Sequence, residues 1–290
     1  MMATAIGRVS AAAREAELRL GDAARTTAFL QGRLRFEARA DDVFISSYPR
    51  SGTTLVQQIV DVLLHDGESG TEHLSERSPW FERNLALGRS SVADFARLPS
   101  PRAFKSHLPR AWLPSGARYV YVVRDGRDVA VSYYHLYRSH LDFSGAFEQF
   151  FELFLHGELQ YGSWFKHVDD WRRHARSPDV CFVEYEQLTR DLTAGMTRLS
   201  TFLGTGHTPE RIAQLSELCS FAYMKSHEDR FDHATEERAL RGLSTGSFVR
   251  TGRVGEHRAI FCAEQLRRFD EQRRSPRRLR LELDLPAFLH

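Results

Sequence analysis

The chain lacks the features that mark several large classes of protein. It has no run of the ~20 apolar residues that a membrane-spanning helix needs, and residues 1–14 lack the apolar stretch of a secretory signal. Its 40 Lys and Arg residues against 38 Asp and Glu residues leave a net charge of only +2, too balanced for a protein whose main partner is nucleic acid or an anionic membrane. We therefore expect a cytoplasmic protein that binds neither nucleic acid nor membrane.

Cysteine and lysine are also scarce. The three cysteines, Cys181, Cys219 and Cys262, are too few and too scattered for a zinc cluster or a disulfide framework, which fits a reducing compartment. We expect each to be a small buried side chain. Only three of the 40 basic residues are lysines, so a lysine within a chemically suggestive motif stands out.

What the chain does contain is enough for a large core, because 42% of its 290 residues are hydrophobic. Residues 1–35 are rich in Ala, Arg and Glu with weak helical periodicity, which predicts an N-terminal helical arm outside the core. Residues 36–290 are expected to form one domain. Within it, residues 71–100 are expected to be rich in loops and residues 228–246 to be a charged, mobile segment.

Three short apolar runs are typical of buried strands. Residues 43–47 lead through a polar loop into a segment with helical spacing at 55–64, and residues 118–123 lead into an amphipathic segment at 129–138. Residues 180–183 are again followed by helical sequence. This alternation predicts a single α/β domain with a central parallel sheet flanked by helices. Because such sheets bind ligands at the carboxyl ends of their strands, we expect the three following loops to converge.

The loop after the first run has the composition of an anion site. Ser51, Gly52, Thr53 and Thr54 are small enough for backbone N–H groups to surround an anionic oxygen at a helix start, and Arg50 adds positive charge. The spacing of a nucleotide P-loop is missing, so the loop is only P-loop-like. A helix start capped by Ser or Thr is the alternative, but the preceding strand and the arginine favour phosphate.

The loop after the second run suggests another phosphate contact. Arg124 ends the run and Ser132 follows about two helical turns later. An arginine in this place can bind a phosphate bidentately. Alone, it would more often pair with a neighbouring carboxylate such as Asp125 or Asp128, but two phosphate-type loops on one sheet are harder to explain in that way.

Lys105 and His107 are two residues apart and lie on the same side if their segment is extended. A histidine can take a proton from an attacking hydroxyl near neutral pH, and a lysine can neutralise charge on a leaving group. One histidine among thirteen is more often structural, so the pair alone does not establish catalysis.

Together these motifs resemble the cytosolic sulfotransferases, in order and spacing, from about residue 36 to residue 270. Such enzymes transfer a sulfuryl group from 3′-phosphoadenosine 5′-phosphosulfate (PAPS) to a hydroxyl or amine of a small acceptor, release 3′,5′-adenosine bisphosphate (PAP) and use no metal. The matching motifs lie at residues 48–54, 105–109, 121–134, 157–158, 161–164, 185–186 and 248–256.

The resemblance implies roles for individual residues. His107 would be the general base, Lys105 its companion cation, and the loop from Arg50 to Thr54 the cradle of the phosphosulfate. The other donor-binding residues it implies fall into two groups: Arg124, Ser132, Arg250, Thr251 and Gly252 around the 3′-phosphate, and Tyr185, Ser220, Phe221 and Met224 around the adenine.

Five positions depart from the family pattern. Arginine replaces the usual lysine at Arg50, and Thr251 replaces a cation, which predicts weaker control of the donor phosphates. Leu55 replaces an aromatic residue that often stacks on the adenine, and His257 replaces a tryptophan. In the dimer motif, which maps to residues 258–267, the final acidic residue has become Arg267, so we expect a monomer or a different dimer.

The acceptor is poorly specified. The residues that fall where the family lines its acceptor pocket are mostly aromatic or apolar, which favours a phenol or another apolar alcohol, although each could equally be plain core. They are Trp80, Phe81, Phe104, Leu136 and Tyr137.

Two other functions remain open. A P-loop kinase is disfavoured because the Gly-Lys-Ser/Thr ending and a clear magnesium-binding acid after a strand are missing. A nucleotide-binding module without catalysis is disfavoured because Lys105 and His107 are both present.

Overall fold

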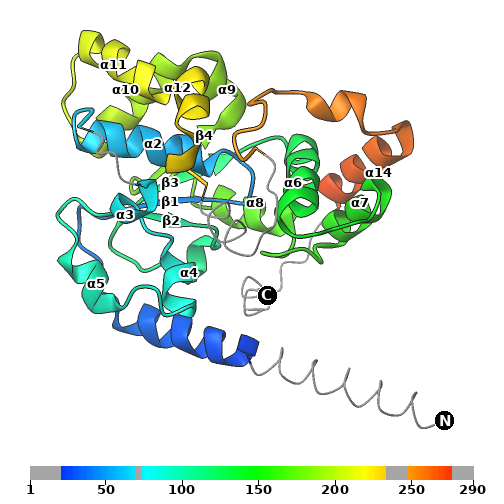
Figure 1. The fold of residues 1–290 in the computed structure, drawn as a ribbon, viewed down its shortest axis with the longest axis horizontal. Coiled ribbons are helices and arrows are strands. Elements are labelled where there is room, and N and C mark those ends of the chain that lie inside the picture. Colours follow the sequence, from blue (N-terminus) through cyan, green and yellow to red (C-terminus); the bar gives the residue numbers. More distant parts are fainter. Residues whose placement is uncertain (1–20, 69–72, 233–246, 276–290) are drawn as a thin grey trace.

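A computed structural model of the protein describes residues 21–68, 73–232 and 247–275. Its centre is a four-stranded sheet in the order β2-β1-β3-β4, and all three strand pairs are parallel (Figure 1). The α/β architecture expected from the sequence is therefore confirmed. The strands are β1 (Val43–Ser47), β2 (Ala103–Ser106), β3 (Arg118–Val123) and β4 (Val180–Glu184).

Helices cover both faces of the sheet, as the continuous apolar strands require. In Figure 1, α2 and α9 to α12 lie above the sheet, α3 to α5 lie below it, and α6, α7, α8 and α14 gather to one side. The helices are α2 (Thr53–Leu64), α3 (Leu74–Arg77), α4 (Phe81–Ala86), α5 (Val92–Arg97), α6 (Gly126–His140), α7 (Phe147–His156), α8 (Trp164–Arg172), α9 (Tyr185–Arg190), α10 (Leu192–Leu203), α11 (Pro209–Ser216), α12 (Phe221–Ser226) and α14 (Ala263–Arg274), with short 3₁₀ turns at Arg110–Trp112, Glu217–Cys219, Glu228–Arg230 and Glu256–Ala259.

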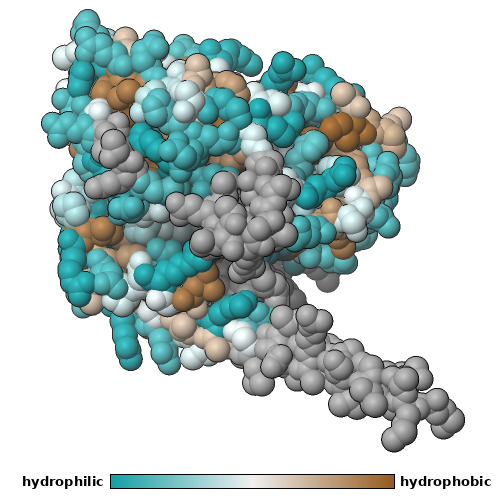
Figure 2. Space-filling model, in the orientation of Figure 1, coloured by the Kyte–Doolittle hydropathy of each residue, from teal (hydrophilic) through white to brown (hydrophobic). Residues whose placement is uncertain are grey.

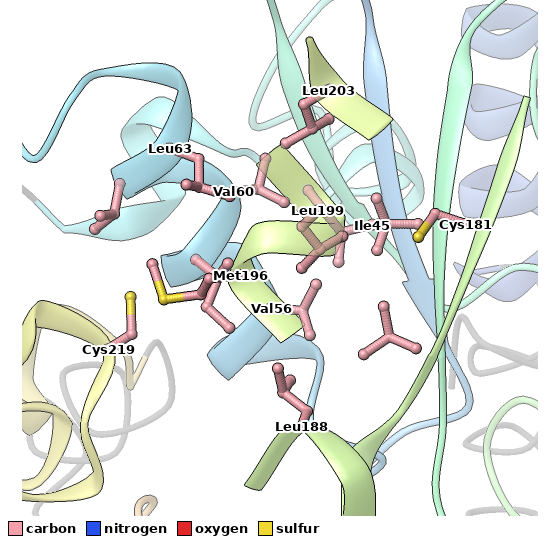
Figure 3. Close-up of a cluster of buried hydrophobic side chains, with 14 of the residues drawn as sticks. Ile45, Val56, Val60, Leu63, Cys181, Leu188, Met196, Leu199, Leu203 and Cys219 are labelled. Carbon is pink, nitrogen blue, oxygen red and sulfur yellow. The ribbon is translucent and has the colours of Figure 1, made fainter. Parts of the chain in front are cut away.

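One face of the sheet packs on α2, α9, α10 and α11. Ile45 and Cys181 point from the strands toward Val56 and Val60 of α2 and Leu199 of α10 (Figure 3). All five side chains are at most 4% exposed. This aliphatic layer fixes where α2 begins relative to the end of β1.

The opposite face is aromatic. Phe44 and Phe104 stack with their ring centroids 5.1 Å apart, and Phe81 of α4 meets the edge of Phe44 at 5.2 Å. Residues 21–35 are helical, and Phe29 on this helix is fully buried against Phe81. This part of the predicted N-terminal arm therefore contributes to the core.

Three local expectations need correction. Residues 73–100 contain the three short helices α3, α4 and α5 and are not mainly loop, because helices of four to six residues are too short to show a periodic pattern. Cys181 and Cys219 are buried, but Cys262 is exposed, since it precedes the surface helix α14. Most of the predicted mobile segment, residues 233–246, lies outside the described residues.

The outer surface is mainly hydrophilic on the face shown in Figure 2, with hydrophobic residues scattered in small groups. Among the described residues, none of the helices combines the length and the hydropathy that crossing a bilayer would require.

Candidate active site

A cavity of about 990 Å³ lies at the carboxyl ends of the strands. Its walls come from segments far apart in the chain: the loop after β1, the end of β2, the starts of α6 and α9, and residues 248–252. The convergence of loops predicted from the sheet topology is thus present. Most of the predicted donor residues line the cavity: Arg50, Gly52, Thr53, Thr54, Arg124, Ser132, Tyr185, Phe221, Met224, Arg250, Thr251 and Gly252.

The loop after β1 turns sharply into α2. Arg50 has φ 69° and Gly52 has φ 102°, so two of three successive residues are in the left-handed region. Gly52 is the N-cap of α2, and no described side chain caps the helix there. The first backbone N–H groups of α2 therefore lack side-chain acceptors, and together with the positive end of the helix dipole they suit an anion.

Gly52 is needed for a close approach as well as for its backbone angle. A Cβ atom at this position would lie 2.4 Å from Cδ2 of Tyr185, which begins α9. The Tyr185 hydroxyl donates to the carbonyl of Gly52's counterpart on the far loop, Gly252, at 3.3 Å. The tyrosine thus connects the β1 loop with the loop near residue 252.

Arg124 lies at the end of β3 and is only 7% exposed. Its guanidinium donates to the carbonyl oxygens of Arg50, at 3.2 Å, and Arg253, at 2.9 Å, and packs 4.6 Å from the ring centroid of Tyr185. Its Nε is buried and has no hydrogen-bond partner among the described residues. A buried, incompletely satisfied cation facing a cavity suits an anionic ligand.

Arg50 and Ser132 meet across the cavity. Nε of Arg50 donates to Oγ of Ser132 at 3.1 Å, and the guanidinium packs 5.1 Å from the Phe248 ring centroid. Burial, together with the charges of Arg124 and Arg250, lowers the pKa of Arg50 to about 10. Three clustered arginines repel one another, so an anion bound between them would relieve the repulsion.

The C-terminal loop is tied to α6 and to itself. Asp128 of α6 accepts hydrogen bonds from the backbone N–H groups of Gly255, at 2.6 Å, and His257, at 3.0 Å, and contacts Nδ1 of His257 at 2.6 Å. Arg250 forms an ion pair with Glu256. His257, the departure from the family's tryptophan, therefore helps to hold this loop in place.

His107 follows β2 and is 5% exposed. Its Nδ1 lies 2.8 Å from the carbonyl oxygen of Ser47 at the end of β1. Because a carbonyl only accepts, Nδ1 carries the hydrogen and Nε2 holds the lone pair. Burial, and next the charge of Lys105, keep the pKa of His107 well below its usual value, so the imidazole is neutral at pH 7.

Lys105 lies in β2 on the same wall of the cavity, and its Nζ is 4.0 Å from the ring centroid of Trp80. Burial lowers the pKa of Lys105 to about 7, and the charge of Arg83 acts in the same direction. The expected extended segment is a real strand, and it places a neutral base and an adjacent cation beside the anion site.

The remaining predicted residues lie elsewhere. Ser51 is buried with its N–H bonded to the carbonyl of Tyr48, and Ser220 caps α12, so neither is among the cavity-lining residues. Of the five acceptor candidates, Trp80 and Leu136 line the cavity. Phe81 and Phe104 are fully buried in the aromatic core, and Tyr137 packs on Tyr133 with ring centroids 4.9 Å apart.

Several cavity residues carried no sequence signal. Arg83, Tyr161 and Phe248 line the cavity, as do His140 and Asp232, whose side chains lie 3.7 Å apart and are both buried. They follow no recognisable motif, and only the folded chain brings them together. Among the described ranges, no group of three or more His, Cys, Asp or Glu residues is placed to hold a metal ion.

Comparison with known proteins identifies the family. The sulfotransferase domain family matches residues 40–277. Human sulfotransferase 1C2 is 32% identical over 246 residues, covering 81% of this chain and 83% of its own length. Mouse sulfotransferase 2B1 is 35% identical over 242 residues, covering 80% of this chain and 70% of its own.

Solved structures agree in fold. Retinol dehydratase in complex with androsterone and the inactive cofactor PAP has a TM-score of 0.77 and 25% identity, covering 89% of this chain and 88% of its own. Mouse sulfotransferase SULT7A1 complexed with PAP has a TM-score of 0.70 and 29% identity, covering 86% of this chain and 89% of its own. The chain therefore belongs to the sulfotransferase family, enzymes that transfer a sulfuryl group to an acceptor.

Proposed function

We propose that the protein transfers a sulfuryl group from PAPS to the hydroxyl of a small apolar acceptor, with His107 as the general base. The observation that carries this proposal is that one cavity is lined by the anion-binding loop after β1, by Arg124 and by His107. The PAP named in the structures of two similar proteins supports the choice of nucleotide.

The residues present fit such a donor. When bound, PAPS would supply an activated sulfuryl group. The uncapped start of α2, with Arg50, would hold its phosphosulfate, and Arg124, Ser132 and Arg250 would hold its 3′-phosphate. The unsatisfied Nε of Arg124 and the cleared space at Gly52 support this assignment.

His107 and Lys105 would act on the acceptor side of the donor. The lone pair at Nε2 would take the proton of the acceptor hydroxyl as its oxygen attacks sulfur. Lys105 and Arg50 would stabilise the negative charge that develops on the leaving phosphate. A neutral imidazole at pH 7 is the form that this role needs.

The acceptor would occupy the part of the cavity near Trp80, Leu136 and Tyr161. The indole and phenol rings beside His107, with centroids 5.0 and 5.2 Å from the imidazole, favour a flat apolar alcohol such as a phenol. Amines are a second class to be tested.

We also propose that the protein does not form the family's dimer through residues 258–267. Arg267 pairs with Glu264 and Glu271 of its own helix, so its charge is used within the chain. A monomer or a different dimer is expected, and sedimentation in the presence of PAP would distinguish them.

The decisive experiment is to incubate the purified protein with sulfur-labelled PAPS and a mixture of phenols, alcohols and amines, and to identify labelled product by mass spectrometry. We expect sulfated phenols. No sulfated product over the whole mixture would refute the proposal. Thermal stabilisation by ATP with magnesium, but not by PAP, would favour phosphoryl transfer instead.

A further inference from the structure

Glu82, at the start of α4, is a fully buried carboxylate directly behind the acceptor side of the cavity. Its Oε1 accepts a hydrogen bond from Nε1 of Trp80 at 2.7 Å. The same oxygen accepts a second hydrogen bond from the backbone N–H of His107 at 2.8 Å. One atom thus connects the indole on the cavity wall with the segment that carries the imidazole.

The two groups held by Glu82 are themselves in contact. The Trp80 and His107 rings meet edge to face with centroids 5.0 Å apart, and Nζ of Lys105 lies 4.0 Å from the indole centroid. The chain before α4 also pairs with β2, since the backbone N–H of Lys105 donates to the carbonyl of Pro79 at 2.9 Å. A displacement of Trp80 would therefore be felt at His107 and at Lys105.

Burying a carboxylate is costly unless hydrogen bonds replace its hydration. Both donors that reach Oε1 are neutral, and both belong to the reaction side of the cavity. A purely structural position here could be filled by an apolar residue if the two N–H groups had another acceptor. The retained carboxylate is thus best explained by the orientation that it imposes on both donors.

We propose that Glu82 is a positioning residue that sets the orientation of the His107 segment and the Trp80 indole together through one carboxylate oxygen. This proposal rests on the proposed function of the site. It assigns to Glu82 the reach of its oxygen and not its charge, and this distinction can be tested by substitution.

Two conservative variants separate reach from charge. Glu82→Gln keeps an oxygen at the same distance and removes the charge, whereas Glu82→Asp keeps the charge and withdraws the oxygen by one methylene. We expect kcat with 2-naphthol and PAPS to fall by ~10- to 100-fold in Glu82→Asp, because small misplacements at a reacting centre are costly. We expect Glu82→Gln to retain most of the parent kcat, and KM for PAPS to change in neither variant.

Asp42→Asn is the matched control. Asp42 is another fully buried carboxylate, paired with Arg102 and remote from the cavity lining. We expect it to lower the melting temperature without changing kcat per folded molecule. Equal loss of kcat in both Glu82 variants, a larger loss in Glu82→Gln, or parent-like kcat in Glu82→Asp would each overturn the proposal. If the parent protein itself sulfates no acceptor, the proposed function fails and not the role of Glu82.

Discussion

Burial affects the two titratable groups of the β2 wall in the same direction but with different consequences. It keeps His107 in the neutral form that can accept a proton, and it brings the pKa of Lys105 close to neutrality, to about 7. The wall therefore holds a ready base beside a cation that is easily discharged.

Replacement of His107 by alanine tests the base. We expect kcat to fall by ~10²- to 10⁴-fold, the usual effect of removing a general base. Binding of PAP, measured by the increase in melting temperature, should persist because His107 makes no contact within the anion-binding loop other than with Ser47. Turnover close to that of the parent would refute the assignment.

Replacement of Lys105 by methionine tests the cost of its burial. Between pH 7 and the ordinary lysine value of 10.5, the unfolded chain holds a proton that the native chain has released, so native stability increases with pH in this window. We expect Lys105→Met to increase the free energy of unfolding at pH 7 by ~0.5–2 kcal/mol, and to flatten that increase.

The exposed Lys166 gives the control for this measurement, since Lys166→Met should leave the pH dependence of denaturant unfolding unchanged. An identical pH profile in the parent and in Lys105→Met would show that Lys105 is not discharged in the native protein.

Replacement of Gly52 by alanine tests the close approach of Tyr185. The new Cβ would combine an unfavourable φ of 102° with a contact of 2.4 Å, so we expect a stability loss of ~1–3 kcal/mol, and a clear increase in KM for PAPS. Gly204→Ala, at φ 74° with no neighbour within 4 Å of the new atom, imposes backbone strain alone. If both variants show the same KM, the approach of Tyr185 is not needed for donor binding.

At the scale of elements, the sequence predicts best where function interferes least. β1, β3 and β4 are continuous apolar runs buried on both faces, and each was predicted within one residue of its observed bounds. β2 is only four residues long and contains Lys105 and Ser106, so its extended form was a condition and not a prediction. Functional residues conceal this strand.

The pleat of β2 also explains why Phe104 is not on the cavity. Successive side chains of a strand point to opposite faces, so Phe104 enters the aromatic core while Lys105 faces the cavity. Motif resemblance placed both in the site because it carries no information on side-chain direction. Cavity residues such as Arg83 and Asp232 were missed because they belong to no motif.

The N-terminal end of α6 offers a test at this scale. Asp128→Ala removes three contacts to Gly255 and His257, so we expect a loss of ~1–3 kcal/mol of stability, and an increased KM for PAPS as the C-terminal loop loosens. Asp125→Ala, which removes the N-cap of the same helix, should lower stability without changing KM. An unchanged KM in Asp128→Ala would separate this loop from donor binding.

At the scale of the whole molecule, the donor site joins segments from residue 50 to residue 252. PAP should therefore protect the backbone amides of the β1 loop and of residues 248–254 from hydrogen exchange together. At a PAP concentration of 100 times its Kd, we expect ~2.7 kcal/mol of added stability. Protection of one segment alone would contradict a single nucleotide bound between them.

The anion-binding loop and the imidazole follow β1 and β2, two strands held in register by backbone hydrogen bonds. The spacing of the transfer machinery is therefore a property of the sheet. Trp80, Arg83 and Leu136, in contrast, lie at or on the helices α4 and α6 outside the sheet. Substitutions in these helices can therefore change which compounds are sulfated without moving the groups that carry out the transfer.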